Sequence, residues 1–255
     1  MAWLRRPEGW NRFQPIRRKH AAPGGDMSPE PRILAVNPGS TSTKVSVFEG
    51  EKEVWKLKLD HSTQELAPYQ RIFDQYDFRE KVILGSLEEA GYPIRSFSAV
   101  VGRGGLSRPI PGGTYRVTPG LLKDLSTGTY GEHASNLGAP IAAKLAESAG
   151  CDAFMVDPVV VDELEPQARY TGHPSLCRRS IFHALNQRAV ARKVAGELGR
   201  DYGECNFIVV HLGGGISVGA HRLGRVVDVN NALDGDGPFS PERSGGLPSG
   251  QLAEL

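Results

Sequence analysis

The sequence predicts an α/β protein built from two related halves. Short apolar runs rich in β-branched residues alternate with amphipathic stretches of helical length, which is typical of α/β folds. A pattern of strand, small-residue turn and two further strands begins near residue 32 and again near residue 207. The two turns start at Asn37 and at His211, 174 residues later. This repetition predicts that each half presents its turn to a shared cleft.

Each copy of the pattern contains three predicted strands. In the first copy, residues 32–36 precede a polar turn at 37–44, and residues 45–48 and 54–59 follow as a hairpin turning at 49–52. In the second copy, the strands are 207–210, 216–220 and 226–229, and the turn at 211–215 is rich in glycine. The close parallel between the copies favours a duplication.

The segment between the copies predicts three amphipathic helices and one strand. The first helix covers residues 72–87. The second carries an apolar stripe over residues 137–145 and ends at Gly150, and the third begins near residue 185 and ends at Gly199. The apolar stripe of the third helix consists of Leu185, Val190, Val194 and Leu198. Residues 153–156 predict a strand that ends at Asp157.

The two ends differ from the rest of the chain. Residues 1–26 hold six Lys or Arg against two acidic residues, and they predict a disordered basic extension over 1–31 ahead of a natural start at Met27. An organelle transit peptide is the alternative, although such peptides are usually rich in serine. Residues 249–255 predict a helix that has only begun after a capping Ser249, so we expect an interrupted chain. The expected domains are 32–175 and a truncated 176–255.

Composition excludes several classes of function. The formal net charge of +1 argues against a general affinity for nucleic acid or acidic membranes. No apolar run approaches the ~20 residues of a membrane-spanning helix, and no secretory signal is evident. The three cysteines are far apart and lack CxxC spacing, which fits a reducing cytoplasm better than disulfides or a zinc site.

The turn at 37–44 is the first candidate phosphate-binding loop. Its small residues let a ligand approach the backbone, Ser40 and Ser42 offer hydroxyls, and Lys44 adds a positive charge after Asn37. It is not a Walker A loop, because the required spacing is absent and a strand follows. Alone it reads equally well as a polar hairpin turn. The second loop favours the functional interpretation, because two phosphate-sized loops suit an ATP cleft.

Two arginines stand among glycines or small residues where an anion could approach the guanidinium. Arg103 follows an apolar strand and precedes Gly104, and Arg243 lies in a turn before Gly245. Such a pair could hold a carboxylate and a phosphoryl group. A surface arginine in a flexible turn is the alternative for each.

Further polar residues occupy the predicted ends of strands and starts of helices. Asp157 ends a strand, where open α/β sheets place ligands, although an Asx turn explains it equally well. His133 and His183 each begin a helix and could be structural. No His or Cys pair has metal-ligand spacing, so we expect Mg²⁺ to arrive with a nucleotide rather than on protein ligands. The acidic run 162–165 predicts a solvated face, and residues 234–237 predict a tight turn.

Taken together and in order, five segments resemble the butyrate-type members of the acetokinase family. They are residues 37–44, 103–105, 157–164, 179–186 and 211–217, and the likeness extends from about residue 32 to residue 255. The resemblance implies two ribonuclease H-like (actin-like ATPase) domains, the second incomplete. It also implies that family members continue past the point matching residue 255, and that they form a homodimer or a higher homo-oligomer.

The resemblance implies reversible phosphoryl transfer from ATP to butyrate, giving butyryl phosphate and ADP. The positions that match the family's phosphate loops are Asn37, Ser40, Ser42 and Lys44, then His211, Gly213, Gly214 and Gly215. Arg103 and Arg243 match residues that hold the carboxylate and the phosphoryl oxygens. Asp157 matches an essential acid, and His133 and His183 match residues that stabilise the phosphoryl group during transfer.

Three alternatives remain open at this point. Within the class, a branched-chain fatty acid, acetate or propionate kinase would need only a different pocket size. An inactive remnant or binding module would keep part of the fold and expose a hydrophobic face. A chaperone-like or actin-like ATPase would have no carboxylate substrate for Arg103 and Arg243 to hold.

Overall fold

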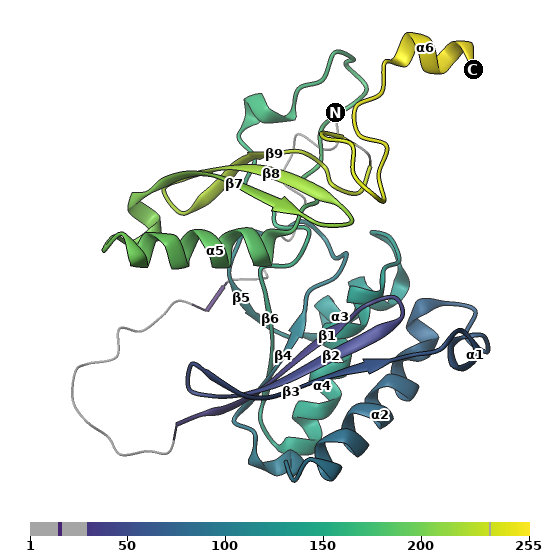
Figure 1. The fold of residues 1–255 in the computed structure, drawn as a ribbon, viewed down its shortest axis with the longest axis vertical. Helices are drawn as coiled ribbons and strands as arrows, with labels where there is room; N and C mark the ends of the chain where they lie inside the picture. The colour runs from purple at the N-terminus through teal and green to yellow at the C-terminus, as the bar shows by residue number, and fades with distance from the viewer. Residues whose placement is uncertain (1–14, 17–29, 235) are drawn as a thin grey trace. The chain divides into compact units, whose positions relative to one another are not determined.

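The computed structural model describes residues 15–16, 30–234 and 236–255, and its chain divides into two compact units (Figure 1). Of the described residues, the N-terminal unit comprises 15–16, 30–108 and 113–158, and the C-terminal unit comprises 109–112, 159–234 and 236–255. The predicted extension over 1–31 and the start at Met27 lie almost wholly outside the described residues. The domain boundary expected after residue 175 stays a prediction.

The N-terminal unit is a mixed sheet with helices packed on it. Its strands are β1 (Arg32–Pro38), β2 (Ser42–Glu49), β3 (Lys52–Asp60), β4 (Ala99–Arg103), β5 (Thr114–Arg116) and β6 (Asp152–Val156), in the order β3-β2-β1-β4-β6-β5. Its helices are α1 (Thr63–Leu66), α2 (Tyr76–Glu89), α3 (Pro119–Thr127) and α4 (Gly138–Ala149), with the 3-10 turns η3 (Ile72–Gln75), η4 (Ile94–Ser96) and η5 (Ala134–Leu137). The sequence does not predict β5 or α3.

Alternation along the strands builds the core of this unit. Leu34 and Val36 of β1 are fully buried, and they pack in one cluster with Ile83 of α2 and Ile141 of α4. Figure 1 shows α2 and α4 beside the sheet. The stripe predicted over 137–145 is confirmed, because its apolar members are buried, and Gly150 caps α4 in the left-handed conformation with φ 76°.

The C-terminal unit contains a three-stranded antiparallel sheet in the order β7-β8-β9. Its elements are η6 (Pro166–Arg169), α5 (Ala184–Glu197), η7 (Tyr202–Glu204), β7 (Asn206–Leu212), β8 (Ile216–Arg222), β9 (Arg225–Val229) and α6 (Ser249–Glu254). Helix α5 covers one face of the sheet, where Ala191 and Ala195 pack with Phe207 and Val209. No helix among the described residues is long and apolar enough to span a membrane.

The two hairpins repeat one another in register as well as in sequence. Asn37 pairs with Lys44 across β1 and β2, and His211 pairs with Ser217 across β7 and β8. In each hairpin the second strand also pairs with a third strand, and the register of that second pairing shifts at one point. The shift lies at Val47/Phe48 in β2 and at Ala220/His221 in β8, which are equivalent positions in the two hairpins. The predicted strand and turn pattern is confirmed in both units.

The matching faces of the two hairpins differ in how they are covered. Leu34 and Val36 lie beneath helices, whereas the residues at the matching positions of β7, Ile208 and Val210, are 70% and 51% exposed. With Leu212, which is 74% exposed, they form an apolar strip along β7. An exposed hydrophobic face, the feature named for the remnant or binding-module alternative, is therefore present among the described residues.

The predicted apolar stripe of α5 is wrong. Leu185, Val190 and Leu198 are exposed, and the buried face instead consists of Ala184, Gln187, Arg188, Ala191 and Ala195. Small alanines bring the helix close to the sheet, and the two long polar residues are buried because each has polar partners beneath the helix.

Two smaller predictions also fail. The acidic run 162–165 is not a solvated face, because the side chain of Glu163 is only 8% exposed and pairs with buried Arg188 at 3.0 Å, while Asp162 pairs with Arg169 at 2.6 Å. Ser249 does not cap the last helix, since it lies inside α6 and Pro248 occupies the cap position.

Candidate functional site

Three predicted site residues lie at the carboxyl ends of neighbouring parallel strands. Strand β4 pairs in parallel with β1 on one side and with β6 on the other. Asn37 lies at the end of β1, Arg103 is the last residue of β4, and Asp157 directly follows β6. This edge is where open α/β sheets place their ligands.

Asn37, Lys44 and Arg103 form one polar group at this edge. Arg103 donates through Nη1 to Oδ1 of Asn37 at 3.2 Å, and Lys44 stands directly opposite Asn37 in the ladder. Both Asn37 and Lys44 are exposed, whereas burial lowers the pKa of Arg103, a guanidinium that stays charged at neutral pH. Two cations beside an amide suit a bound anion.

A buried arginine that sequence reasoning missed shapes the first loop. Arg79 of α2 is 1% exposed, and burial lowers its pKa. Its guanidinium donates to the carbonyl oxygens of Gly39 at 2.8 Å, Ser40 at 3.0 Å and Ser42 at 3.1 Å. It also donates to Oγ1 of Thr43 and to Oε1 of Gln75. The loop is thus bound to one side chain.

The bonds to Arg79 fix the direction in which the loop's amides point. In a trans peptide the carbonyl of one residue and the N–H of the next point in opposite directions. Because the carbonyls of Gly39 and Ser40 point at the guanidinium, the N–H groups of Ser40 and Thr41 point away from it. Both residues are exposed. Two successive outward N–H groups are suited to a phosphate oxygen.

The strands extend further into the first loop than predicted. β1 continues to Pro38 and β2 begins at Ser42, so the turn proper is residues 39–41. Asn37, Ser42 and Lys44 therefore lie on strands, and Ser40 alone of the four predicted residues lies in the turn.

Asp157 and His133 each contact the backbone near them. Asp157 is 1% exposed with φ 38°, and its Oδ1 accepts from the N–H of Gly113 at 2.7 Å. A buried carboxylate held in the left-handed region is consistent with a constrained site residue as well as with a turn. His133 caps η5, where its Nδ1 accepts from the N–H of Ser135 at 3.2 Å.

The C-terminal unit brings its predicted residues together. The rings of His183 and His211 are stacked with centroids 3.7 Å apart and planes 7° apart. A Cβ on Gly213 would stand 3.2 Å from Nε2 of His211, and a Cβ on Gly215 would stand 3.7 Å from Nε2 of His183. The two imidazoles therefore present their Nε2 edges to the glycine-rich loop.

Arg243 belongs to the same cluster through the turn that carries it. Its Nε donates to the carbonyl of Ala232 at 3.1 Å, an oxygen that also lies 3.7 Å from a Cβ built on Gly215. In the same turn, the hydroxyl of Ser240 and the N–H of Glu242 both donate to the carbonyl of Gly214, at 2.8 and 3.0 Å. The turn at 240–243 is thus fastened to the loop.

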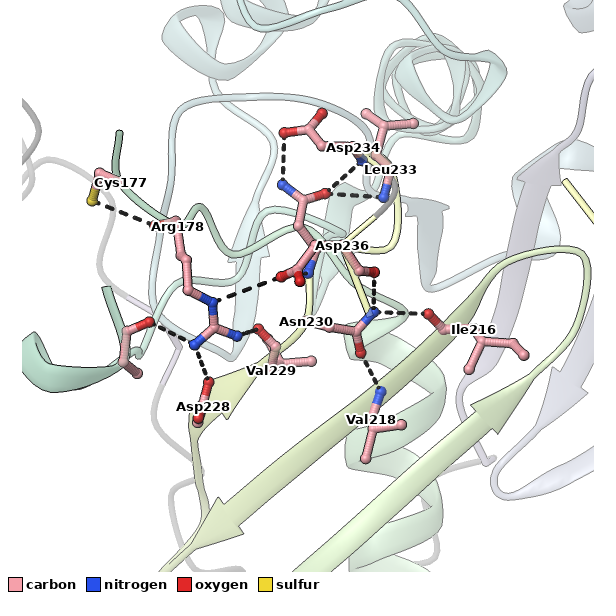
Figure 2. A network of polar contacts seen from close by, with 12 residues as sticks. Cys177, Arg178, Ile216, Val218, Asp228, Val229, Asn230, Leu233, Asp234 and Asp236 are labelled. Carbon is pink, nitrogen blue, oxygen red and sulfur yellow. Dashed lines mark hydrogen bonds and ion pairs between the residues drawn. The ribbon is translucent and has the colours of Figure 1, made fainter. Parts of the chain in front are cut away.

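A polar network holds the chain between β9 and this turn, as Figure 2 shows. Asn230 accepts from the N–H of Val218 at 2.7 Å and donates to the carbonyls of Ile216 and Asp236. Arg178 pairs with Asp228 at 2.9 Å and lies 3.7 Å from the Asp236 carboxylate. Both acids therefore have structural partners in this network.

The described residues contain no group of three or more His, Cys, Asp or Glu that could hold a metal ion. Cys151, Cys177 and Cys205 are all free thiols.

Arg79 had one signal in the sequence, because it occupies the apolar side of α2, four residues before Ile83 and eight before Leu87. An arginine at a core position of a helix indicates buried polar partners.

The chain is similar in sequence to named butyrate kinases over most of its length. It is 58% identical over 224 residues to "Butyrate kinase 2" of Clostridium acetobutylicum, a match that covers 88% of this chain and 63% of the relative. It is 55% identical over 222 residues to "Probable butyrate kinase" of Listeria innocua, covering 87% and 62%. The chain thus spans just under two thirds of the length of these relatives.

Solved structures show the fold, and a family profile agrees with the sequence relatives. An acetate kinase from Porphyromonas gingivalis matches with a TM-score of 0.68 at 19% identity, covering 88% of this chain and 63% of that one. A propionate kinase from Francisella tularensis matches at 0.64 and 16%, covering 88% and 63%. The predicted fold class, that of the actin-like ATPases, is confirmed. A profile of the Acetokinase family matches residues 166–240, so both this profile and the sequence relatives make the chain similar to kinases for short-chain acids.

Proposed function

We propose that this chain carries the phosphoryl-transfer residues of an ATP-dependent kinase for short-chain carboxylates, with butyrate as the preferred acceptor. The observation that carries the proposal is the cluster in the C-terminal unit, where His183, His211, the loop at 213–215 and Arg243 converge. The names of the relatives support butyrate over other acids.

The chemistry asks for what these residues offer. A carboxylate is already a nucleophile at neutral pH, so the transfer needs alignment and neutralised charge more than a strong base. Arginines and imidazole N–H groups stabilise charge on the equatorial oxygens of the transferring group. In this proposal Arg243 and His183 serve that purpose, with His133 as a further phosphoryl contact.

The residues of the N-terminal unit take complementary roles in the proposal. Arg103 binds the acceptor carboxylate beside Asn37, and Lys44 with the outward amides of the 39–41 turn binds ATP phosphate oxygens. Asp157, buried and bonded to backbone, orients its neighbours rather than accepting a proton. The glycine-rich loop with His211 forms the second phosphate-binding loop.

ATP and Mg²⁺ fit this residue set in different ways. The phosphates of ATP bind to backbone N–H groups, and glycines in both loops leave room for the phosphates to approach those groups. Mg²⁺ prefers oxygen ligands and keeps several waters, so in this proposal it enters bound to the phosphates of ATP. When bound, it would neutralise charge on the phosphates during transfer.

A hydroxamate assay tests the proposal directly. The chain is incubated with ATP, Mg²⁺, hydroxylamine and a series of acids from acetate to valerate, including the branched isobutyrate and isovalerate. A second protein joins residue 255 to the part of the Clostridium acetobutylicum relative that the match leaves uncovered. Acyl hydroxamate formed fastest with butyrate supports the proposal. No hydroxamate with any acid in either protein refutes it.

The series also separates the alternatives. Faster reaction with isobutyrate or isovalerate would assign a branched-chain fatty acid kinase, and faster reaction with acetate or propionate would assign those kinases instead. Each methylene is worth about 1 kcal/mol or more in a fitted pocket, so rates should differ by about fivefold or more between neighbouring acids. Activity of the joined protein alone would identify the chain by itself as an inactive portion.

Two further features are proposed for the whole protein. A homodimer or higher homo-oligomer is expected from the family, and light scattering on a purified sample measures its mass. A cytoplasmic location accords with three free cysteines, because oxidising compartments favour disulfides.

A further inference from the structure

His183 lies at one end of a chain of buried polar side chains that the proposed function does not use. Nδ1 of His183 lies 3.0 Å from Oγ of Ser217, whose Oγ and backbone carbonyl both accept from Nε2 of Gln187, at 2.8 and 3.0 Å. Oε1 of Gln187 lies 3.0 Å from Nε2 of His221, and Nδ1 of His221 lies 2.8 Å from the hydroxyl of Tyr202. We call these four residues the relay: Ser217, Gln187, His221 and Tyr202.

The relay is enclosed beneath α5 and closely packed. Ser217 and Gln187 are fully buried, His221 is 2% exposed and Tyr202 is 8% exposed. A Cβ on Gly219 would stand 2.3 Å from Oε1 of Gln187, so only glycine leaves room for the amide at that position. A network this enclosed has little freedom to rearrange its donors and acceptors.

The direction of each hydrogen bond follows from one backbone group. The carbonyl of Ser217 can only accept, so the amide nitrogen of Gln187 must face it and its oxygen must face His221. That oxygen can only accept, so Nε2 of His221 must carry a proton. Burial lowers the pKa of His221 to about 4, so its ring is neutral at pH 7, its Nδ1 accepts, and Tyr202 donates to it.

The same reasoning reaches His183 from the other side. Oγ of Ser217 accepts from Gln187 at 2.8 Å and, by a longer bond of 3.5 Å, from the backbone N–H of His183. These two bonds use its lone pairs, which leaves its own proton to be donated to Nδ1 of His183. A ring nitrogen that accepts is unprotonated, so the proton of neutral His183 is on Nε2, the edge that faces the glycine-rich loop.

We infer that Ser217, Gln187, His221 and Tyr202 are positioning residues that hold His183 as its Nε2-protonated tautomer, which makes it a hydrogen-bond donor toward the phosphoryl group. The role of His183 at the phosphoryl group rests on the proposed function. The tautomer itself does not, because it follows from the relay alone.

Nitrogen-15 NMR of the full chain with labelled histidine tests the tautomer without any substrate. Loss of one signal in His183→Gln assigns the residue among seven histidines. At pH 7.5 we expect a pyridine-type Nδ1 and a pyrrole-type Nε2 for His183. A pyrrole-type Nδ1, an averaged pair of signals or an imidazolium at this pH would overturn the inference.

Two serine variants separate the relay from general effects of packing. Ser217→Ala should release His183 into a mixture of tautomers, which appears as averaged nitrogen shifts. Ser180→Ala is the matched control, because Ser180 is also buried in this unit but donates to the carbonyl of Val161. An unchanged tautomer in Ser217→Ala would refute the relay, and if that variant does not fold, Gln187→Met takes its place.

Kinetics then report on function separately. In whichever protein forms hydroxamate, Ser217→Ala should lower kcat by about tenfold to a hundredfold with little change in KM for ATP. A fixed tautomer in a protein without kinase activity would leave the relay standing and remove the proposed function. Kinase activity in a protein whose His183 is a mixture of tautomers would support the proposed function and refute the relay.

Discussion

Replacing Arg79 with methionine tests whether one buried cation organises the first loop. Methionine keeps most of the length and the apolar stem of the side chain but cannot donate. The change removes the guanidinium from five acceptors, which are the carbonyls of Gly39, Ser40 and Ser42, the hydroxyl of Thr43 and Oε1 of Gln75.

The expected loss of stability is smaller than a sum over those bonds. A hydrogen bond from a charged donor contributes about 1.5–3 kcal/mol net, so five acceptors would suggest an implausibly large total. Burial of the guanidinium carries a desolvation cost, which is why its pKa is lowered. Residues 40 and 41 of the turn are exposed, so water can replace some of the lost bonds once the arginine is gone. We therefore expect Arg79→Met to lower the free energy of unfolding by about 3 kcal/mol.

Equilibrium unfolding in urea measures that loss, and amide hydrogen exchange in β1 and β2 shows whether the loss lies in this hairpin. Arg95→Met is the matched control, because Arg95 is exposed on η4 and its replacement should change stability by less than about 0.5 kcal/mol. Arg79→Lys should fall between, since one ammonium has only three protons to donate. Equal stability of Arg79→Met and Arg95→Met would refute the reasoning.

The same variant tests the direction of the loop amides. Without Arg79 the carbonyls of Gly39 and Ser40 lose the donor that fixes them inward, so the N–H groups of Ser40 and Thr41 lose their preferred direction. We expect the affinity for ATP, measured by calorimetry, to fall about tenfold, which corresponds to about 1.4 kcal/mol. Unchanged affinity in a folded Arg79→Met protein would show that the outward amides do not bind phosphate.

Three further predictions follow from the same contacts. Gly102→Ala should lower the free energy of unfolding by about 2–3 kcal/mol in chemical denaturation, because the added Cβ would stand 2.1 Å from the carbonyl oxygen of Gly138 on α4. In Gly85→Ala the added Cβ has no atom within 4 Å, so this variant should raise the free energy of unfolding by up to about 1 kcal/mol. Burial lowers the pKa of His221 from the ordinary 6.5 to about 4, so as the pH falls the unfolded chain binds a proton before the folded chain does. The free energy of unfolding should therefore fall by up to about 3 kcal/mol between pH 6.5 and pH 4. Unfolding measured across that range should show no such dependence in His221→Gln. Arg243→Ala in a protein that forms hydroxamate should raise the barrier by about 2–4 kcal/mol and lower kcat more than it raises KM, and an unchanged kcat would remove Arg243 from the mechanism.

Local patterns in the sequence were sufficient to predict every described strand except β5, and the duplication of the hairpins. Alternating or continuous apolar runs indicate strands without knowledge of their partners, and each predicted strand is present. The helix ends were equally accessible, because glycine after an apolar stripe is a local signal, as Gly150 shows. The residues at strand ends could be named for the same reason.

Pairings between distant residues could not be predicted in this way. Glu163 reads as one member of an acidic run, and only the fold places Arg188 of α5 3.0 Å from it. The same pair explains why the predicted stripe of α5 failed. Hydrophobicity alone favours Leu185 and Val190 for the buried face, but the face that is buried carries the arginine and glutamine that satisfy polar groups below.

The two candidate phosphate-binding loops show why only part of such a site can be predicted from a sequence. In the first loop, a guanidinium from α2 captures the carbonyls of Gly39 and Ser40. In the second, the hydroxyl of Ser240 and a backbone N–H capture the carbonyl of Gly214. Both arrangements turn the following N–H groups away from the captured carbonyls, because a trans peptide leaves them no other direction. Each hairpin therefore has a loop carbonyl bound by a donor from outside the loop, but the donors differ, and a comparison of the two loop sequences alone would find neither Arg79 nor Ser240.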